Sequence, residues 1–219
     1  MTKSNVRVKY TTIEFGNIDL HVRTLKDNQQ FFDKDDIAKN LGISSALWPL
    51  FGIIWPSSKV LANYMLHFDT TSKKVLEVGC GIGLSSLLLN HLDAHITATD
   101  YHPEVESFLL KNTHLNDDKK IPFIRADWAE AKNSAFDEYD LIIASDVLYE
   151  SSCAELLSTF LNQYAKKSCE IIIVDPDRGN HSKFSKEMVG LGFTHTKFKP
   201  DTQSYMQEPY KGHIHCYQR

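Results

Sequence analysis

Three glycines alternate with other residues between Glu77 and Leu84, directly after an apolar stretch at 74–78 that is typical of a buried strand. Glycine permits positive φ and carries no Cβ atom that would hold a ligand away from the backbone. Ser85 and Ser86 can help to satisfy the free N–H groups where a helix would begin. A strand, a glycine turn and a helix start in succession favour the binding of a nucleotide-bearing cofactor.

The spacing of the glycines distinguishes between cofactors. A dinucleotide-binding turn follows G-x-G-x-x-G, and its third glycine would fall at Leu84. The sequence over 77–83 is instead Glu-x-Gly-x-Gly-x-Gly, which disfavours a nicotinamide oxidoreductase. It resembles motif I of the Rossmann-like methyltransferases that use S-adenosylmethionine. For this run taken alone, an ordinary strand-to-helix loop is an equal alternative.

Two further apolar runs lead to residues that suit a nucleoside. The run 95–99 ends in Asp100, where a nucleotide-binding βαβ unit presents a carboxylate to ribose hydroxyls. The run 121–125 leads to Asp127 and Trp128, a carboxylate beside a flat ring that would suit adenine. Taken singly, Asp127 is better explained as a helix cap and Trp128 as a packing residue. Taken in order, three strand ends carry the expected residue types, which favours a cofactor site.

A fourth run, 141–145, brings Asp146 and Tyr149 to the same expected edge of the sheet. Asp146 can accept a hydrogen bond from an attacking nitrogen, and Tyr149 can stack on a methylene chain or face a sulfonium charge. The two residues therefore suit an amine acceptor. The alternative is that Asp146 caps the following helix and Tyr149 fills the core.

The elements that position these residues alternate regularly along the chain. The pattern predicts an α/β fold, in which a Rossmann-like, doubly wound, mostly parallel seven-stranded sheet carries helices on both faces. Ligands then bind at the carboxyl ends of the strands. Beyond the runs above, we expect helices at 84–91, 103–116, 152–165 and 181–191, and strands at 170–174, 194–199 and 213–217.

The N-terminal part of the chain has a different pattern. Polar and apolar residues alternate over 10–24 and predict a β-hairpin that turns at Gly16 and Asn17. Two prolines interrupt the aromatic stretch 47–58, so it is neither a regular helix nor a central strand. Beyond it, Ser57 or Ser58 can cap a helix. We expect a single methyltransferase domain over 1–219, with this hairpin and aromatic segment (1–58) preceding the Rossmann-like core (59–219).

The composition restricts the function classes. The 219 residues are 42% hydrophobic and carry a net charge of −4, which suits one α/β domain without a broad nucleic-acid footprint. The four cysteines form no C-x-x-C pair, which favours a reduced, cytoplasmic location. No secretion signal or membrane span is evident in the sequence. A protein or small-molecule substrate is favoured, and the oligomeric state is open.

Ten histidines raise the question of a metal site. His213 and His215, followed by Cys216, form the tightest cluster, and a strand would put the two histidines on one face. A metal site needs three or four ligands, and no second cluster is evident in the sequence. We therefore expect no metal, and interpret the pair as polar residues on the exposed side of a terminal strand.

Together, four motifs between residues 52 and 164 resemble the seven-β-strand protein methyltransferases of the lysine methyltransferase-like family 16. They are the Trp-Pro-Ser-Ser run at 55–58, the glycine motif at 77–83, Asp127-Trp128 and the Asp-Val-Leu-Tyr run at 146–149. The resemblance implies the fold above and S-adenosylmethionine as cofactor. Trp48 is an alternative to Trp55, but its spacing to the glycines is less favourable. The implied cofactor-binding residues are Trp55, Glu77, Gly79, Cys80, Gly81, Gly83, Leu84, Asp100, Tyr101, Asp127, Trp128 and Ser145, and the catalytic residues are Asp146 and Tyr149.

The resemblance implies methyl transfer by direct displacement onto a lysine of a protein substrate. A lysine amine, with a reference pKa of about 10.4, must first lose a proton, and Asp146 is expected to orient the amine rather than to deprotonate it. The residues 175–179 are expected only to line the acceptor side. The chain lacks the Asn/Asp-Pro-Pro-Tyr/Phe signature of base and glutamine methyltransferases at 146–149. A small-molecule N-methyltransferase and a catalytically silent module that binds S-adenosylmethionine or a protein partner are the alternatives.

Overall fold

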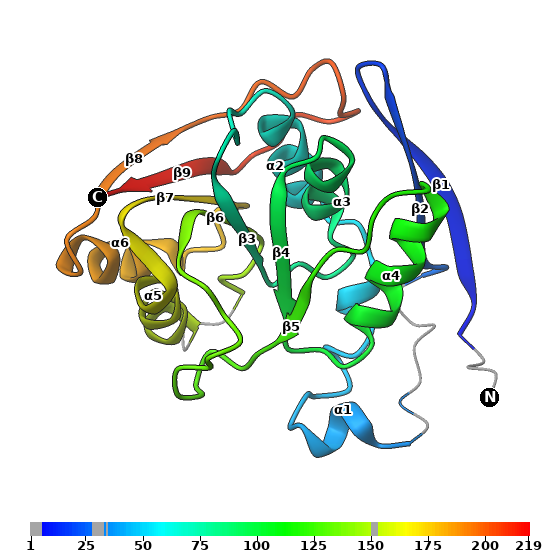
Figure 1. Ribbon diagram of the computed structural model, residues 1–219, viewed down its shortest axis with the longest axis horizontal. Coiled ribbons are helices and arrows are strands. Elements are labelled where there is room, and N and C mark those ends of the chain that lie inside the picture. The colour runs from blue at the N-terminus through cyan, green and yellow to red at the C-terminus, as the bar shows by residue number, and fades with distance from the viewer. Residues whose placement is uncertain (1–5, 28–32, 34, 150–152) are drawn as a thin grey trace.

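A seven-stranded sheet forms the centre of the computed structural model, which describes residues 6–27, 33, 35–149 and 153–219 (Figure 1). The strand order is β5-β4-β3-β6-β7-β9-β8. The strands are β3 (Lys74–Val78), β4 (His95–Asp100), β5 (Phe123–Arg125), β6 (Tyr139–Ser145), β7 (Ala165–Asp175), β8 (Thr194–Phe198) and β9 (His213–Gln218). The helices are α1 (Ile37–Asn40), α2 (Pro56–Leu66), α3 (Leu84–His91), α4 (Val105–Leu115), α5 (Cys153–Tyr164) and α6 (His181–Gly190), with a 3₁₀ turn η1 (Leu50–Gly52).

The sheet is parallel except at β9. Strands β5, β4, β3, β6 and β7 pair in parallel, whereas β9 runs antiparallel to both β7 and β8. The carboxyl ends of β3, β4, β6 and β7 consequently meet at one edge of the sheet. Strands β3 to β5 are added in one direction across the sheet and β6 and β7 in the other, so the order of the strands reverses between β3 and β6. Ligands of doubly wound folds bind at such a reversal. The expected Rossmann-like, mostly parallel fold is confirmed.

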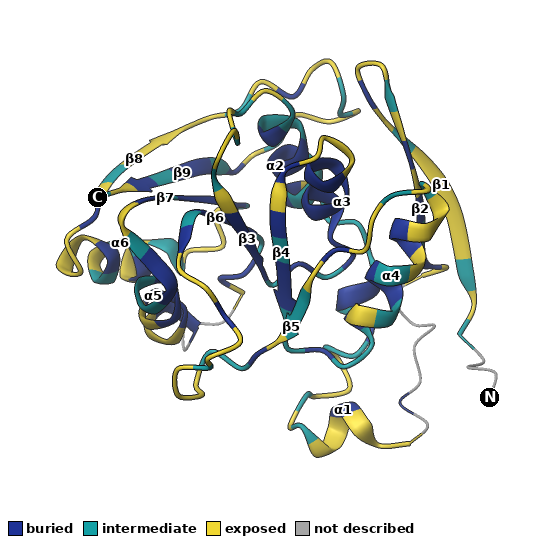
Figure 2. Cartoon of the chain, in the orientation of Figure 1, coloured by how far each residue is buried: buried dark blue, intermediate teal, exposed yellow. Residues whose placement is uncertain are grey.

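Alternate residues of the central strands face two separate apolar layers. Val75 packs in the layer that contains residues of α2, α3 and α4, whereas Leu76 and Val78 pack in the layer of α5 and α6. Figure 2 shows the inner strands dark blue, as expected for a sheet covered on both faces. The strand ends are therefore held rigidly from both sides.

The N-terminal hairpin is docked on α4 (Figure 1). Strands β1 (Val8–Phe15) and β2 (Ile18–Leu25) pair antiparallel around a turn at Gly16 and Asn17, as expected. The side chain of Asn112 accepts from Arg23 N at 2.7 Å and donates to Arg23 O at 3.2 Å. Asn116 makes the same pair of contacts with His21. Two amide side chains, Asn112 in α4 and Asn116 at its C-cap, thus satisfy the edge of β2.

Most expected elements agree with the structure within a few residues, and three points differ. Trp55, not Ser57 or Ser58, is the N-cap of α2, because Pro56 takes the first helical position, where its missing N–H costs nothing. Strand β7 begins at Ala165 rather than 170, and β5 begins only after Pro122. The expected start of α5 at Ser152 lies outside the described residues. No helix of the described part of the chain is long and apolar enough to cross a bilayer.

Candidate functional site

The glycine loop between β3 and α3 has a backbone that other residues rarely adopt. Gly79, Gly81 and Gly83 all have positive φ, from 54° to 73°. A Cβ atom on Gly79 would also lie 2.7 Å from Cγ1 of Val147, the residue after Asp146. The loop therefore packs directly against the end of β6. The expected turn residues Cys80 and Leu84 are both buried, and burial raises the pKa of the Cys80 thiol, so it is not a reactive thiolate.

The carboxylate of Asp100 joins the end of β4 to this loop. Its Oδ2 accepts from Gly81 N at 2.8 Å, and its Oδ1 accepts from His102 N at 2.9 Å. Burial raises the pKa of Asp100, while these backbone donors oppose the rise. Each oxygen keeps a second lone pair, so Asp100 can still accept from ribose hydroxyls. The structure thus brings Asp100 and the glycine loop together, as the spacing indicated.

Glu77 lies beneath the loop rather than on its open side. Its side chain is 1% exposed, and Oε2 accepts from Ser86 N at 2.8 Å and from Ser86 Oγ. It therefore holds the first turn of α3 in place, which differs from the direct cofactor contact expected from the motif. The serines do not satisfy the helix start as expected, because Glu77 takes the Ser86 N–H and the buried Ser85 Oγ has no partner among the described residues.

Trp128 flanks the glycine loop from the strand β5 side. Its Cζ2 lies 3.8 Å from the position of a Cβ on Gly79. Asp127 accepts from Ala129 N at 2.9 Å, so it closes a turn instead of capping a helix, and it stays half-buried. Ser145, the last residue of β6, is also half-buried at this edge.

The segment before α2 also contacts the glycine loop. The carbonyl oxygen of Phe51 lies 3.1 Å from the position of a Cβ on Gly81, so η1 rests on the loop. Trp55 Nε1 donates to Leu50 O at 3.1 Å, which fixes η1 relative to α2. Trp48 donates to Ile43 O, away from this contact. Tyr101 OH donates to Leu41 O and ties the same N-terminal segment to the end of β4.

Asp146 is paired with Arg178 just after the end of β6. Asp146 adopts φ 56°, and its N–H donates to Val174 O at 2.9 Å. Its side chain is 9% exposed, and Oδ2 accepts from Arg178 Nη2 at 2.8 Å. Burial raises the pKa of Asp146, and the guanidinium of Arg178 opposes that rise. The nearby Tyr149 ring is 44% exposed rather than part of the core.

Two residues close to Asp146 were not among the candidates chosen from the sequence, namely Arg178 and Tyr210. Arg178 lies in the 175–179 segment, to which only a lining role was given. Tyr210 lies in the irregular segment between β8 and β9, and its hydroxyl is 2.7 Å from Ser57 Oγ of α2. Burial raises the pKa of Tyr210, with further contributions from Asp146 and Asp175. Arg178 follows β7, whose carboxyl end lies at the same edge of the sheet as Asp146. That position in the sequence could have identified Arg178 as a candidate site residue.

The terminal histidines are arranged differently from the sequence interpretation. His215 is 1% exposed, not on an open face. His213 Nδ1 lies 2.7 Å from Asp177 Oδ2. The structure also brings His181 and His195 next to His215. Further candidate metal ligands therefore join this cluster, although none was evident from the sequence.

Comparison with known proteins shows which family the chain resembles. A family model described as lysine methyltransferase matches residues 42–189. The protein-lysine methyltransferase METTL21E of Bos taurus is 31% identical over 134 residues, or 56% of this chain and 46% of that protein. The protein N-lysine methyltransferase METTL21A of Xenopus tropicalis is 28% identical over 71% of each chain. The chain spans about half the length of several such relatives.

A solved structure shows the same fold. The magnesium protoporphyrin IX methyltransferase of Synechocystis PCC 6803, crystallised with bound S-adenosylmethionine, superposes with a TM-score of 0.57 at 18% identity. The superposition covers 74% of this chain and 77% of that one. Because the family model spans more than half of the chain and includes the glycine loop, Asp100 and Asp146, this chain belongs to the lysine methyltransferase family.

Proposed function

We propose that this chain transfers a methyl group from S-adenosylmethionine to a lysine side chain of a protein substrate. The two relatives described above, METTL21E and METTL21A, are named protein-lysine methyltransferases. The observation that carries the proposal is the pair of carboxylates on either side of the glycine loop. Asp100 bonds the loop at Gly81, and Asp146 follows the strand end whose Val147 packs on Gly79.

The residues around the loop fit S-adenosylmethionine. We infer that Asp100 binds the ribose hydroxyls, because both of its oxygens retain acceptor capacity. Asp127 and Trp128 would take the adenine, and the first turn of α3 offers backbone N–H groups. Trp55, Tyr101 and Ser145 would border the cofactor, whereas Glu77 supports it only through α3. When bound, the cofactor supplies an electrophilic methyl group on a sulfonium centre.

The acceptor side suits a neutral amine. The Asp146 carboxylate can accept from the N–H of the amine and thereby aim its lone pair. Arg178, 2.8 Å from the same carboxylate, adds a positive charge that disfavours a second cation nearby. Lysine therefore binds better after it has lost its proton to water. We propose that the exposed Tyr149 ring packs on the methylene chain of the substrate.

A labelling experiment tests this function. The purified protein is incubated with methyl-labelled S-adenosylmethionine and a cell lysate, and macromolecules are separated from small metabolites. We expect label on lysine in a protein band, identified by mass spectrometry of peptides. Asp146→Asn should lose at least about 100-fold in rate, because one aligned hydrogen-bond acceptor is removed, while cofactor affinity measured by calorimetry stays within about threefold.

The matched control is Asp117→Asn. Asp117 has φ 53°, close to the 56° of Asp146, but it is exposed at the end of α4. It tests the amide substitution in the same backbone conformation without touching the site. Label confined to small metabolites would favour a small-molecule N-methyltransferase. Cofactor binding without any transfer would favour a silent binding module.

We also propose that residues 1–219 act as a single domain located in the cytoplasm, without a nucleic-acid partner. The docking of the hairpin on α4 through Asn112 and Asn116 supports one folding unit. Cys80, Cys169 and Cys216 form no disulfide among the described residues, which supports a reducing compartment. The net charge of −4 supports a protein rather than a nucleic-acid substrate.

A further inference from the structure

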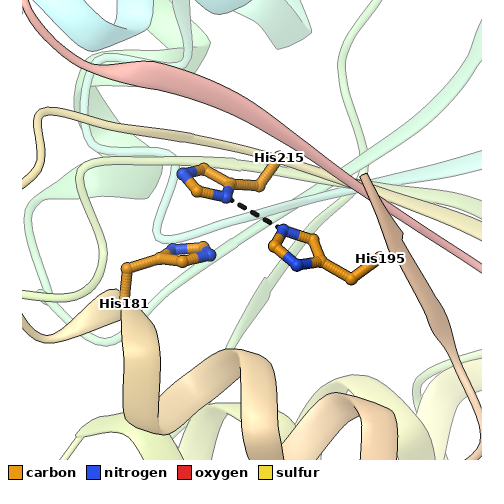
Figure 3. Close-up of side chains that lie close together, drawn as sticks. All are labelled: His181, His195 and His215. Carbon is orange, nitrogen blue, oxygen red and sulfur yellow. Dashed lines mark hydrogen bonds between the residues drawn. The ribbon is translucent and has the colours of Figure 1, made fainter. Parts of the chain in front are cut away.

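Three histidines from three separate elements converge beside the sheet (Figure 3). His181 begins α6, His195 lies on β8 and His215 lies on β9. The register pairs His195 with Tyr217, so His195 and His215 lie diagonally across the antiparallel pair, within side-chain reach. Each ring turns a nitrogen toward the space between the rings (Figure 3), and one nitrogen of each lies within 4.8 Å of the other two.

The distances within the cluster are close to those of a metal site. His195 Nε2 and His215 Nδ1 are 3.1 Å apart, a separation that serves a hydrogen bond as it stands. Two nitrogens bound to one tetrahedral zinc at about 2.0–2.1 Å would be roughly 3.3 Å apart. The ring centroids of His181 and His215 are 3.3 Å apart. These two rings are stacked, so His181 must rotate out of the stack before its lone pair points at an ion held by His195 and His215.

The hydrogen bonding of the cluster is incomplete. His181 Nδ1 and His215 Nε2 are buried and have no partner among the described residues. Buried polar atoms are normally satisfied, but His215 faces His195 with Nδ1, so the candidate ligand atoms are His215 Nδ1 and His195 Nε2 rather than the unpartnered His215 Nε2. The hydroxyls of Tyr217 and Ser185 both lie 2.8 Å from His181 Nε2, and each offers an oxygen for a fourth position.

The surroundings keep the imidazoles neutral. Burial lowers the pKa of His181 to about 4 and that of His215 to about 3, and it also lowers that of His195. Lys197 adds to this lowering for all three rings, and Asp177 opposes it for His181. A neutral imidazole offers a lone pair to a metal, whereas a protonated one does not.

We propose that His181, His195 and His215 bind a zinc ion. Imidazole ligands suit Zn²⁺, and three histidines with one further oxygen complete its tetrahedral coordination. The ion would fasten the first turn of α6 to β8 and β9. That turn follows the segment that carries Asp177 and Arg178, so the site borders the acceptor side without sharing a residue with the proposed cofactor site. The zinc site does not rest on the proposed methyl transfer.

Metal titration of the full chain without an affinity tag tests the site. The protein is stripped with a chelator, and Zn²⁺ is titrated in competition with a chromophoric chelator. We expect one equivalent of tight binding. His195→Asn should weaken binding by at least about 100-fold, because even an outer-shell partner is worth 10–100-fold. His181→Asn, at the start of α6, is a second variant that does not depend on the fold of β8.

The matched control is His95→Asn, which replaces an exposed strand histidine far along the sheet in β4. It should bind zinc like the wild type. Co²⁺ should give the intense visible bands of a tetrahedral site without a sulfur charge-transfer band. Absence of stoichiometric binding, wild-type zinc affinity in the folded His195→Asn and His181→Asn variants, or a cysteine-to-cobalt band would overturn the proposal. Circular dichroism confirms the fold of each variant independently of methyl transfer.

Discussion

The Arg178 guanidinium donates to the Asp146 carboxylate across 2.8 Å and thereby joins the end of β6 to the segment after β7. Asp146 is 9% exposed, whereas Arg178 is 44% exposed. The carboxylate of Asp146 is thus nearly desolvated. The Arg178 side chain can move toward solvent more easily than the Asp146 side chain can. In the proposed reaction, the amine acceptor and Arg178 would bind the same carboxylate, so we expect the ion pair to affect methyl transfer.

Replacement of Arg178 should change the pH dependence of methyl transfer. Burial raises the pKa of Asp146 and Arg178 lowers it, so Arg178→Ala should raise that pKa further. Asp146 then becomes protonated at a higher pH, so the acidic limb of the pH–rate profile shifts to higher pH. We expect kcat/KM to fall about tenfold or more near neutral pH. Arg178→Lys, which keeps the charge, should retain more activity, and an unchanged profile in Arg178→Ala would contradict the role.

Crowding at the glycine loop should make Gly79 intolerant of substitution. In Gly79→Ala, the new Cβ would meet Val147 Cγ1 at 2.7 Å, in addition to the strain of a positive φ. Overpacking of this kind costs about 1–3 kcal/mol. We expect weaker binding of S-adenosylmethionine by calorimetry and a lower melting temperature. The double variant Gly79→Ala/Val147→Ala should recover part of the loss.

Gly16→Ala provides the control for backbone strain alone. Gly16 has φ 63° in the hairpin turn, and nothing lies within 4 Å of the position of its Cβ. The two variants share the left-handed strain, so their difference measures the contact with Val147. If Gly79→Ala and Gly16→Ala lose the same stability, and Gly79→Ala leaves cofactor affinity unchanged, the loop accommodates the alanine methyl group and the prediction is wrong.

Much of the fold could be predicted because local patterns determine it. The strand at 74–78 is apolar on both faces, and the spacing from Gly79 to Asp100 fits one βαβ unit. The carboxyl ends of parallel strands share an edge, which is why Asp100 and Asp146 could be placed together. The predicted N-cap of α2 was wrong. Serine is a common N-cap residue, which favoured Ser57 or Ser58, but Pro56 takes the first helical position and makes Trp55 the N-cap.

The remaining contacts depend on tertiary register. The histidine cluster joins residues from α6, β8 and β9, and only the antiparallel pairing of β8 with β9 sets His195 near His215. Tyr210 lies in a segment without periodicity, so no pattern predicted its contact with Ser57. Glu77 belongs to the motif, but its side chain faces α3 because the strand alternation points it into the interior.

The buried carboxyl of Glu77 should make stability fall as pH rises. Burial raises its pKa to about 7, against a value near 4.5 in the unfolded chain. Below about pH 4.5 the group is neutral in both states, and its contribution is fully present. Between about pH 4.5 and 7 the unfolded chain loses its proton more readily, so up to about 3 kcal/mol of unfolding free energy is lost.

Glu77→Gln isolates this contribution, because the amide oxygen can still accept from Ser86 N but cannot ionise. Urea unfolding of both proteins from pH 4.5 to 8 measures the difference. We expect the wild type to lose stability relative to Glu77→Gln up to about pH 7 and the difference to stay constant above it. Parallel curves throughout would mean that the backbone and hydroxyl donors of Ser86 keep Glu77 ionised in the folded state.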